Sequence, residues 1–224
     1  VYRYEEKEIY DVSEFASDTI KDQEGESTIS SVTSTVTYNT TDNRLDPSSG
    51  SVVEASWEFA GLGGTEKFSK YVLDGRKFWP WKWGTVFSVH GQAGYVHDLG
   101  SKDIPIDERF FLGGINSLRG FETREVGPRD ENGDYIGGDK SIFGNFEYIF
   151  PLVPSVGMKG ITFFDIGNAW GEEEEWFDKL RYSVGAGIRW MSPMGPLRLE
   201  WGYNLDPEDH EDSSKFEFMV GRFF

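Results

Sequence analysis

The chain contains no cysteine, which excludes thiolate zinc sites and cysteine nucleophiles and leaves carboxylates and histidines as candidate metal ligands. The segment 130–134, DENGD, resembles the beginning of a calcium-binding loop. Its glycine has the wrong offset, however, and Ser141 stands at the twelfth position, where such a loop carries a bidentate glutamate. We therefore interpret this segment as an exposed loop rather than a metal site.

No other pattern selects a catalytic or metal-binding group. The three histidines are isolated from one another in the sequence and show no zinc-ligand spacing: His90, His97 and His210. The acidic runs 172–175 and 206–212 fit solvated loops better than a metal cluster. Phosphate-binding, dinucleotide-binding and nucleophile-elbow motifs are absent, and no carboxylate pair stands out for glycoside hydrolysis. We predict a protein that is not an enzyme, with no catalytic residue, metal or cofactor.

One segment is more informative than these. Residues 109–127, RFFLGGINSLRGFETREVG, form an apolar, glycine-rich stretch within the long connection 98–138. Such a stretch would be costly to expose in the middle of a polar loop. We therefore expect it to fold back and pack inside the protein, rather than to lie on the surface.

The elements that must position this segment are strands, because apolar residues alternate with polar or small ones almost throughout the chain. In 181–190, for example, Tyr182, Val184 and Ile188 alternate with Arg181 and Arg189. Ten such segments are predicted: 1–11, 27–39, 51–60, 67–79, 81–97, 139–150, 157–168, 181–191, 196–205 and 214–224.

The connections between these segments alternate between long and short, which is typical of a transmembrane antiparallel up-and-down β-barrel. Ten tilted residues also span roughly 23–25 Å, the height of the apolar band of such a barrel. The mean hydropathy of −0.50 gives no helical span, and the net charge of −17 argues against nucleic-acid binding. The fold class is therefore all-β, with a barrel in a membrane.

The alternation also assigns the two faces of the sheet. We expect the apolar positions to face lipid, among them Trp57, Phe87, Val184, Ile188, Leu199 and Phe218. We expect the polar positions to face the lumen, among them Glu54, His90, Arg189, Arg198 and Glu200.

Residues 110–121, FFLGGINSLRGF, resemble the sixth-loop motif of BamA-type outer-membrane assembly factors. The core of that motif is Val/Ile-Arg-Gly-Phe/Tyr, and Leu118, Arg119, Gly120 and Phe121 occupy it here, with Leu118 as a mild departure. Five further segments resemble family motifs in order: 42–50, 145–151, 163–170, 190–197 and 216–224. The resemblance covers essentially the whole chain.

This resemblance implies a C-terminal fragment of a barrel, or a small barrel derived from one. Family members carry soluble periplasmic POTRA domains and then a barrel of about sixteen strands, of which the ten segments correspond to the last ten. Residues 1–224 are thus expected to be the C-terminal part of the barrel domain, without POTRA domains and first strands. Residues 98–138 are expected to be the long loop that folds into the lumen.

The implied function is to fold and insert β-barrel proteins into the outer membrane of Gram-negative bacteria. The implied partners are membrane lipid, nascent outer-membrane barrel proteins and, in the full-length family, periplasmic lipoproteins of the assembly complex. The exposed backbone of a weak seam at the final strand would template an incoming strand. The residues expected in this seam strand are Phe216, Phe218, Gly221 and Phe224, with Gly221 weakening the pairing.

A clasp inside the lumen is also expected. The strand pattern points Glu147 inward, and Asp165 would be expensive if it faced lipid. Either or both can receive the planar guanidinium of Arg119, which suits bidentate pairing. The resemblance implies the same pairing.

Two other functions compete with assembly. A polypeptide-secreting pore of the two-partner secretion type shares the Arg-Gly-Phe/Tyr loop, although the MSPMGP turn at 191–196 favours the assembly factor. A soluble carbohydrate-binding or hydrolytic β protein is the third possibility, and it would be distinguished by its independence of detergent.

Overall fold

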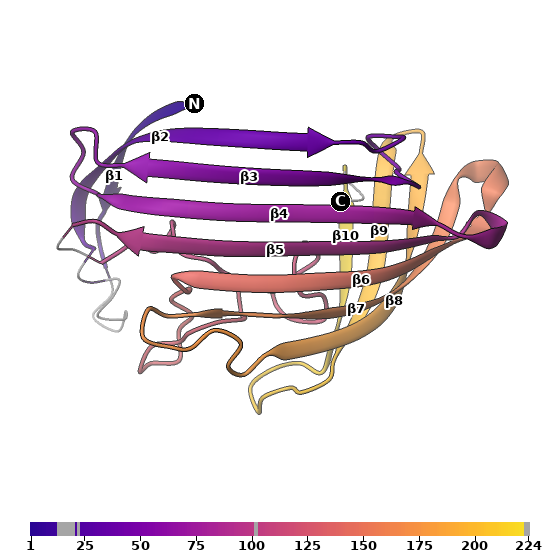
Figure 1. Ribbon diagram of the computed structural model, residues 1–224. Coiled ribbons are helices and arrows are strands. Elements are labelled where there is room, and N and C mark those ends of the chain that lie inside the picture. The colour runs from indigo at the N-terminus through magenta and orange to yellow at the C-terminus, as the bar shows by residue number, and fades with distance from the viewer. Residues whose placement is uncertain (13–20, 22, 101–102, 222–224) are drawn as a thin grey trace.

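The computed structural model describes all residues except 13–20, 22, 101–102 and 222–224. It contains one antiparallel sheet of ten strands that follow one another in sequence order (Figure 1). The strands are β1 (Tyr2–Ile9), β2 (Gly25–Asn39), β3 (Gly50–Ala60), β4 (Phe68–Pro80), β5 (Val86–Asp98), β6 (Lys140–Val153), β7 (Met158–Trp170), β8 (Arg181–Ser192), β9 (Gly195–Asn204) and β10 (Ser214–Val220). Two 3-10 turns, η1 (Lys82–Gly84) and η2 (Pro154–Val156), lie at the same end of the sheet. Within the described residues, no helix has the length and apolar character needed to cross a membrane.

The ten predicted strands and their up-and-down order are confirmed. The largest boundary error is at the start of β5, which begins at Val86 rather than at residue 81. The intervening residues form the turn η1, because Trp83 and Gly84 both adopt positive φ angles, of 58° and 74°, that a strand cannot contain.

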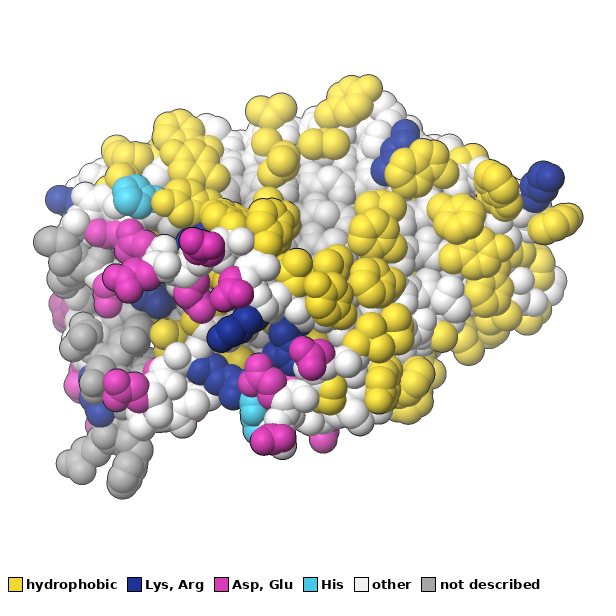
Figure 2. Space-filling model, turned by 60° about the horizontal axis from the view of Figure 1, so that its bottom comes forward, with side chains coloured by type: hydrophobic (Ala, Val, Ile, Leu, Met, Phe, Trp, Pro, Cys, Tyr) yellow, Lys and Arg dark blue, Asp and Glu magenta, His cyan; other side chains and the backbone are white. Residues whose placement is uncertain are grey.

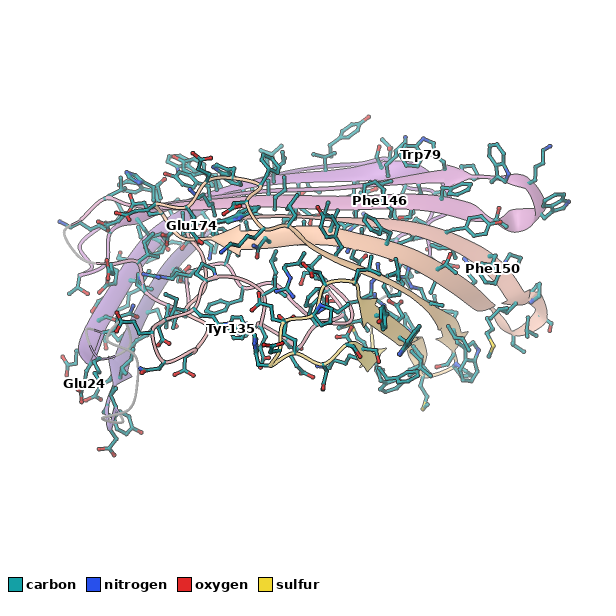
Figure 3. The ribbon with its side chains drawn as sticks, turned by 90° about the horizontal axis from the view of Figure 1, so that it is seen from below. Glu24, Trp79, Tyr135, Phe146, Phe150 and Glu174 are labelled. Carbon is teal, nitrogen blue, oxygen red and sulfur yellow. The ribbon has the colours of Figure 1, made fainter. Side chains whose placement is uncertain are left out.

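The sheet curves like the wall of a barrel, with β1 and β10 at its two edges (Figures 1 and 3). Among the described residues β10 pairs only with β9, and β1 only with β2. Within the described residues, the two edge strands therefore do not pair with each other.

The two faces of the sheet differ as the alternation predicts in its C-terminal half. Leu199 is 46% exposed and Phe218 65%, whereas Arg198 is 4% exposed and Glu200 is fully buried. Glu54 lies on the inner face as expected, because it is opposite Asp74, whose carboxylate meets His90. It is exposed there and accepts a hydrogen bond from Thr37.

The short connections gather at one end of the sheet and the long ones at the other (Figure 1). Charged side chains gather toward the long-loop end, and the surface toward the other end is largely hydrophobic (Figure 2). At the short-turn end, the β2–β3 turn reaches over to β7, where Asp46 forms an ion pair with Lys159 at 2.6 Å. The β5–β6 loop fills much of the concave face between these two ends (Figure 3).

Candidate functional site

The β5–β6 loop, residues 99–139, is held against the concave face by apolar packing at two places. Its first arm places Ile104 in a buried cluster with Phe68 and Val96 of the wall. Its middle places Leu118 and Phe121 in a second buried cluster with Phe143 of β6. The expected burial of the apolar segment is therefore what the structure shows.

Arg119 lies at the centre of this site and is 1% exposed. Its Nε and Nη2 donate to the two carboxylate oxygens of Asp165 at 2.7 and 2.6 Å, and its backbone N–H donates to the same carboxylate at 3.1 Å. The guanidinium also lies 3.6 Å from the ring centroid of Phe163. This is the bidentate geometry for which arginine is suited.

Two further carboxylates complete the contacts of Arg119. Its Nη1 donates to Glu147 at 2.8 Å and to Glu200 at 2.9 Å. Burial alone would lower the pKa of Arg119, but Asp165 and Glu147 outweigh that effect and hold the pKa well above its ordinary value. The guanidinium is therefore charged, and the structure brings it to both carboxylates that the sequence suggested.

The rest of this network could not be seen in the sequence. Glu200 accepts hydrogen bonds from Arg189 and Arg198 as well, at 2.9 and 3.0 Å, and Arg189 also donates to Glu147 at 2.7 Å. Three arginines thus meet three carboxylates in one buried cluster. The alternation of the strands assigned Arg189, Arg198 and Glu200 to the inner face. It did not show which of these side chains would contact one another.

Gly120 brings the loop into backbone contact with β9. It has a φ of +88°, and a Cβ atom built on Gly202 would lie 2.4 Å from the nitrogen of Gly120. Neither position has room for a side chain, so the two glycines set the distance between loop and strand.

A second polar link joins the loop to the wall through Asn145. Its Nδ2 donates to the carbonyl oxygen of Ser117 at 2.6 Å, and its Oδ1 lies 2.9 Å from Nδ1 of His90. Nε2 of His90 is 2.8 Å from Asp74. The histidine that the sequence left without a role is thus part of the support for the loop.

The inner face of the edge strand β10 also meets the loop. Lys215 forms an ion pair with Glu122, and Glu217 is buried with an oxygen beside Gly114. The loop therefore contacts strands from β6 to β10.

The residues expected in the seam strand do not all lie within β10. Phe216 and Phe218 lie on β10 with exposed side chains. Gly221 does not weaken the interior of β10 as expected, because it follows the last residue of the strand with a φ of +115° and its N–H donates to Pro196 at 2.8 Å. Phe224 lies outside the described residues.

Two acidic groups on the outer loops have partners within the protein. Glu208, His210 and Glu211 come within 4.8 Å of one another, but Arg181 forms ion pairs with both glutamates. The segment at 130–134 is a turn in which Asp130 accepts hydrogen bonds from backbone N–H groups. These arrangements are suited to holding loops in place.

Comparison with known proteins gives a consistent result. The chain is 38% identical to the outer membrane protein assembly factor BamA of Nitratidesulfovibrio vulgaris over 100% of its own length and 29% of that protein. Its structure resembles BamA from Haemophilus ducreyi lacking POTRA domains 1–3, with a TM-score of 0.77 at 22% identity, over 86% of this chain and 42% of that one. It resembles CdiB from Acinetobacter baumannii less, with a TM-score of 0.58 at 13% identity, over 86% of this chain and 33% of that one.

The two structural likenesses show the fold alone, and the chain spans less than a third of the length of the curated relative. Residues 2–224 match the Omp85 superfamily domain, which is nearly the whole chain. The chain therefore belongs to the Omp85 superfamily.

Proposed function

We propose that this chain is the membrane-embedded C-terminal part of an outer-membrane protein assembly factor. In this role it folds and inserts β-barrel proteins into the bacterial outer membrane without covalent chemistry. Its partners are membrane lipid and nascent barrel proteins, and the periplasmic lipoproteins of the assembly complex are partners of the intact protein. The 38% identity to a BamA over the whole chain supports an assembly factor over a polypeptide-secreting pore. Membership of the Omp85 superfamily argues against a soluble carbohydrate-binding protein.

The observation that supports this mechanism is the outer edge of β10, which pairs with no strand among the described residues. Hydrogen-bonding direction alternates along an antiparallel strand, and the N–H of Gly221 and the C=O of Ser213 are directed to β9. The backbone groups of Phe216, Phe218 and Val220 therefore point away from β9. An unpaired row of this kind is a template for an incoming strand.

The buried arginine cluster supports this edge. Glu200 of β9 binds Arg119 of the loop, and β9 in turn pairs with β10. We infer that Leu118, Arg119, Gly120 and Phe121, with Glu147 and Asp165, hold the loop so that the edge strand keeps one fixed course.

The test uses the intact protein in phospholipid vesicles, with a urea-unfolded eight-stranded barrel as the client. Phe218→Pro removes an N–H that faces the open side while leaving the β9–β10 hydrogen bonds in place. Phe218→Ile keeps that N–H and is the matched control. We expect the proline variant to slow client folding and the isoleucine variant to fold clients at the unmodified rate. Equal rates for both variants and the unmodified protein would contradict the templating role.

A further inference from the structure

The β5–β6 loop carries a second buried charge, Glu108, which the sequence analysis did not single out. Its side chain is 6% exposed. Oε1 accepts a hydrogen bond from Nη2 of Arg3 on β1 at 2.8 Å, and Oε2 accepts one from Nζ of Lys70 on β4 at 3.1 Å. The same Nη2 of Arg3 donates to Glu58 on β3 at 2.7 Å. One loop carboxylate therefore gathers cations from two strands of the N-terminal half of the sheet.

The surroundings of Glu108 fix its arm of the loop. Nζ of Lys70 lies 5.2 Å from the ring centroid of Phe110, and Ile104 is buried against β2, β4 and β5. Burial alone would raise the pKa of Glu108, but Lys70 and Arg3 outweigh that effect and hold the pKa below its ordinary value. The carboxylate is therefore charged near neutral pH.

Glu108 and Arg119, the two buried charges of the loop, have opposite signs. Their ion-pair partners lie on opposite halves of the sheet. Glu108 binds cations of β1 and β4, whereas Arg119 binds carboxylates of β6, β7 and β9. Exchanging the two arms would place like charges together in buried sites, which is strongly unfavourable. The charges thus determine which arm docks on which half.

We propose that the loop between Glu108 and Arg119 is a strut, and that Glu108 is a positioning residue which sets the separation between the two halves of the sheet. Adjacent antiparallel strands can vary in twist, so the curvature of a sheet is not fixed by its hydrogen bonds alone. A segment anchored on both halves removes that freedom. This inference deepens the proposed function, since the strut would place edge strand β10 for its client.

The test measures distances between spin labels in a cysteine-free form of the intact protein. Labels at Val36 on β2 and Leu199 on β9, both exposed on the outer face, report the separation across the sheet. Labels at Phe146 on β6 and Leu199 report a distance within the C-terminal half and serve as the internal reference.

The variants separate the strut from a general loss of stability. Glu108→Gln removes the charge and keeps the shape, and Lys70→Met removes one of its partners. Glu131→Gln changes an exposed carboxylate of the same loop and is the matched control. Arg119→Ala releases the other anchor. Each variant is first checked for heat-modifiable migration, which reports a folded sheet.

We expect Glu108→Gln and Lys70→Met to broaden the distance distribution between residues 36 and 199 and to leave that between 146 and 199 unchanged. A strut fails once either end is free, so adding Glu108→Gln to Arg119→Ala should broaden the first distribution no further. The proposal is overturned if Glu108→Gln and Lys70→Met match Glu131→Gln, or if the two anchor variants add fully. The distances do not depend on client folding, so failure of the assembly proposal would be seen separately.

Discussion

The buried arginine cluster allows a prediction about which charge is stranded when Arg119 is removed. Arg119→Ala leaves three carboxylates with two arginines, but the carboxylates are not equivalent. Glu147 and Glu200 each keep an ion pair with Arg189. Among the described residues, Asp165 forms an ion pair with Arg119 alone. Breaking a buried pair from one side typically costs about 3–5 kcal/mol. We expect a loss of that size, most of it due to Asp165.

Two double variants distinguish pairing from overall charge. Arg119→Ala with Asp165→Asn and Arg119→Ala with Glu200→Gln both remove one positive and one negative charge. Arg119→Ala with Asp165→Asn removes the carboxylate that Arg119→Ala leaves without an ion pair. Arg119→Ala with Glu200→Gln leaves that carboxylate in place and removes the ion pair of Arg198 with Glu200. We expect the first to recover about 1–3 kcal/mol, the cost of an unsatisfied buried group, and the second to be less stable than Arg119→Ala.

The assay is urea unfolding in lipid vesicles, with protease cleavage of the β5–β6 loop as a local readout. Asp165→Asn alone and Glu200→Gln alone complete the two cycles. Equal stability of the two double variants would show that only net charge matters at this site. Additive effects of Arg119→Ala and Asp165→Asn would show that the observed contact carries no coupling energy.

Three further predictions concern the wall and the loop. Val184→Arg and Leu199→Arg should each cost roughly 2–4 kcal/mol in vesicle folding titrations if these sites lie near the bilayer midplane, and no loss for both would defeat the assignment of the lipid face. Gly202→Ala should increase protease cleavage of the loop, because its Cβ would meet the backbone at 2.4 Å, whereas Gly75→Ala has nothing within 4 Å and should not. The pKa of Glu108 is lower in the folded protein. The ionised carboxylate therefore stabilises the fold above the unfolded pKa of about 4.3, and this stabilisation is lost as the pH falls through the folded pKa. Protease cleavage of the loop should rise as the pH falls through this range, and Glu108→Gln should abolish the rise.

The fold could be predicted from the sequence largely because strand alternation is a local property. Residues such as Leu199 and Glu200 show their faces through the apolar or polar character of their neighbours. The turn at Trp83 could not be predicted in this way, since its positive φ is unusual for a residue with a side chain.

The partners within the site were harder to predict than its members. The pairing of Arg119 with Glu147 and Asp165 could be suggested because the alternation points Glu147 inward and Asp165 interrupts an apolar strand. The family resemblance implies the same pairing. Glu108 lies in a loop without periodicity, and its cations come from β1 and β4, far away in the sequence. Which charges meet depends on the path of the loop across the sheet, and no local pattern encodes that path.

The ion pair between Asp46 and Lys159 has a consequence that the arginine cluster does not share. Its side chains are 29% and 26% exposed, whereas those of Arg119 and Asp165 are 2% and 0% exposed. Dissolved ions screen accessible charges over about 10 Å at 0.1 M and about 3 Å at 1 M, and they screen buried pairs much less. Raising the ionic strength should therefore weaken the contact between the β2–β3 turn and β7 while the β5–β6 loop stays docked.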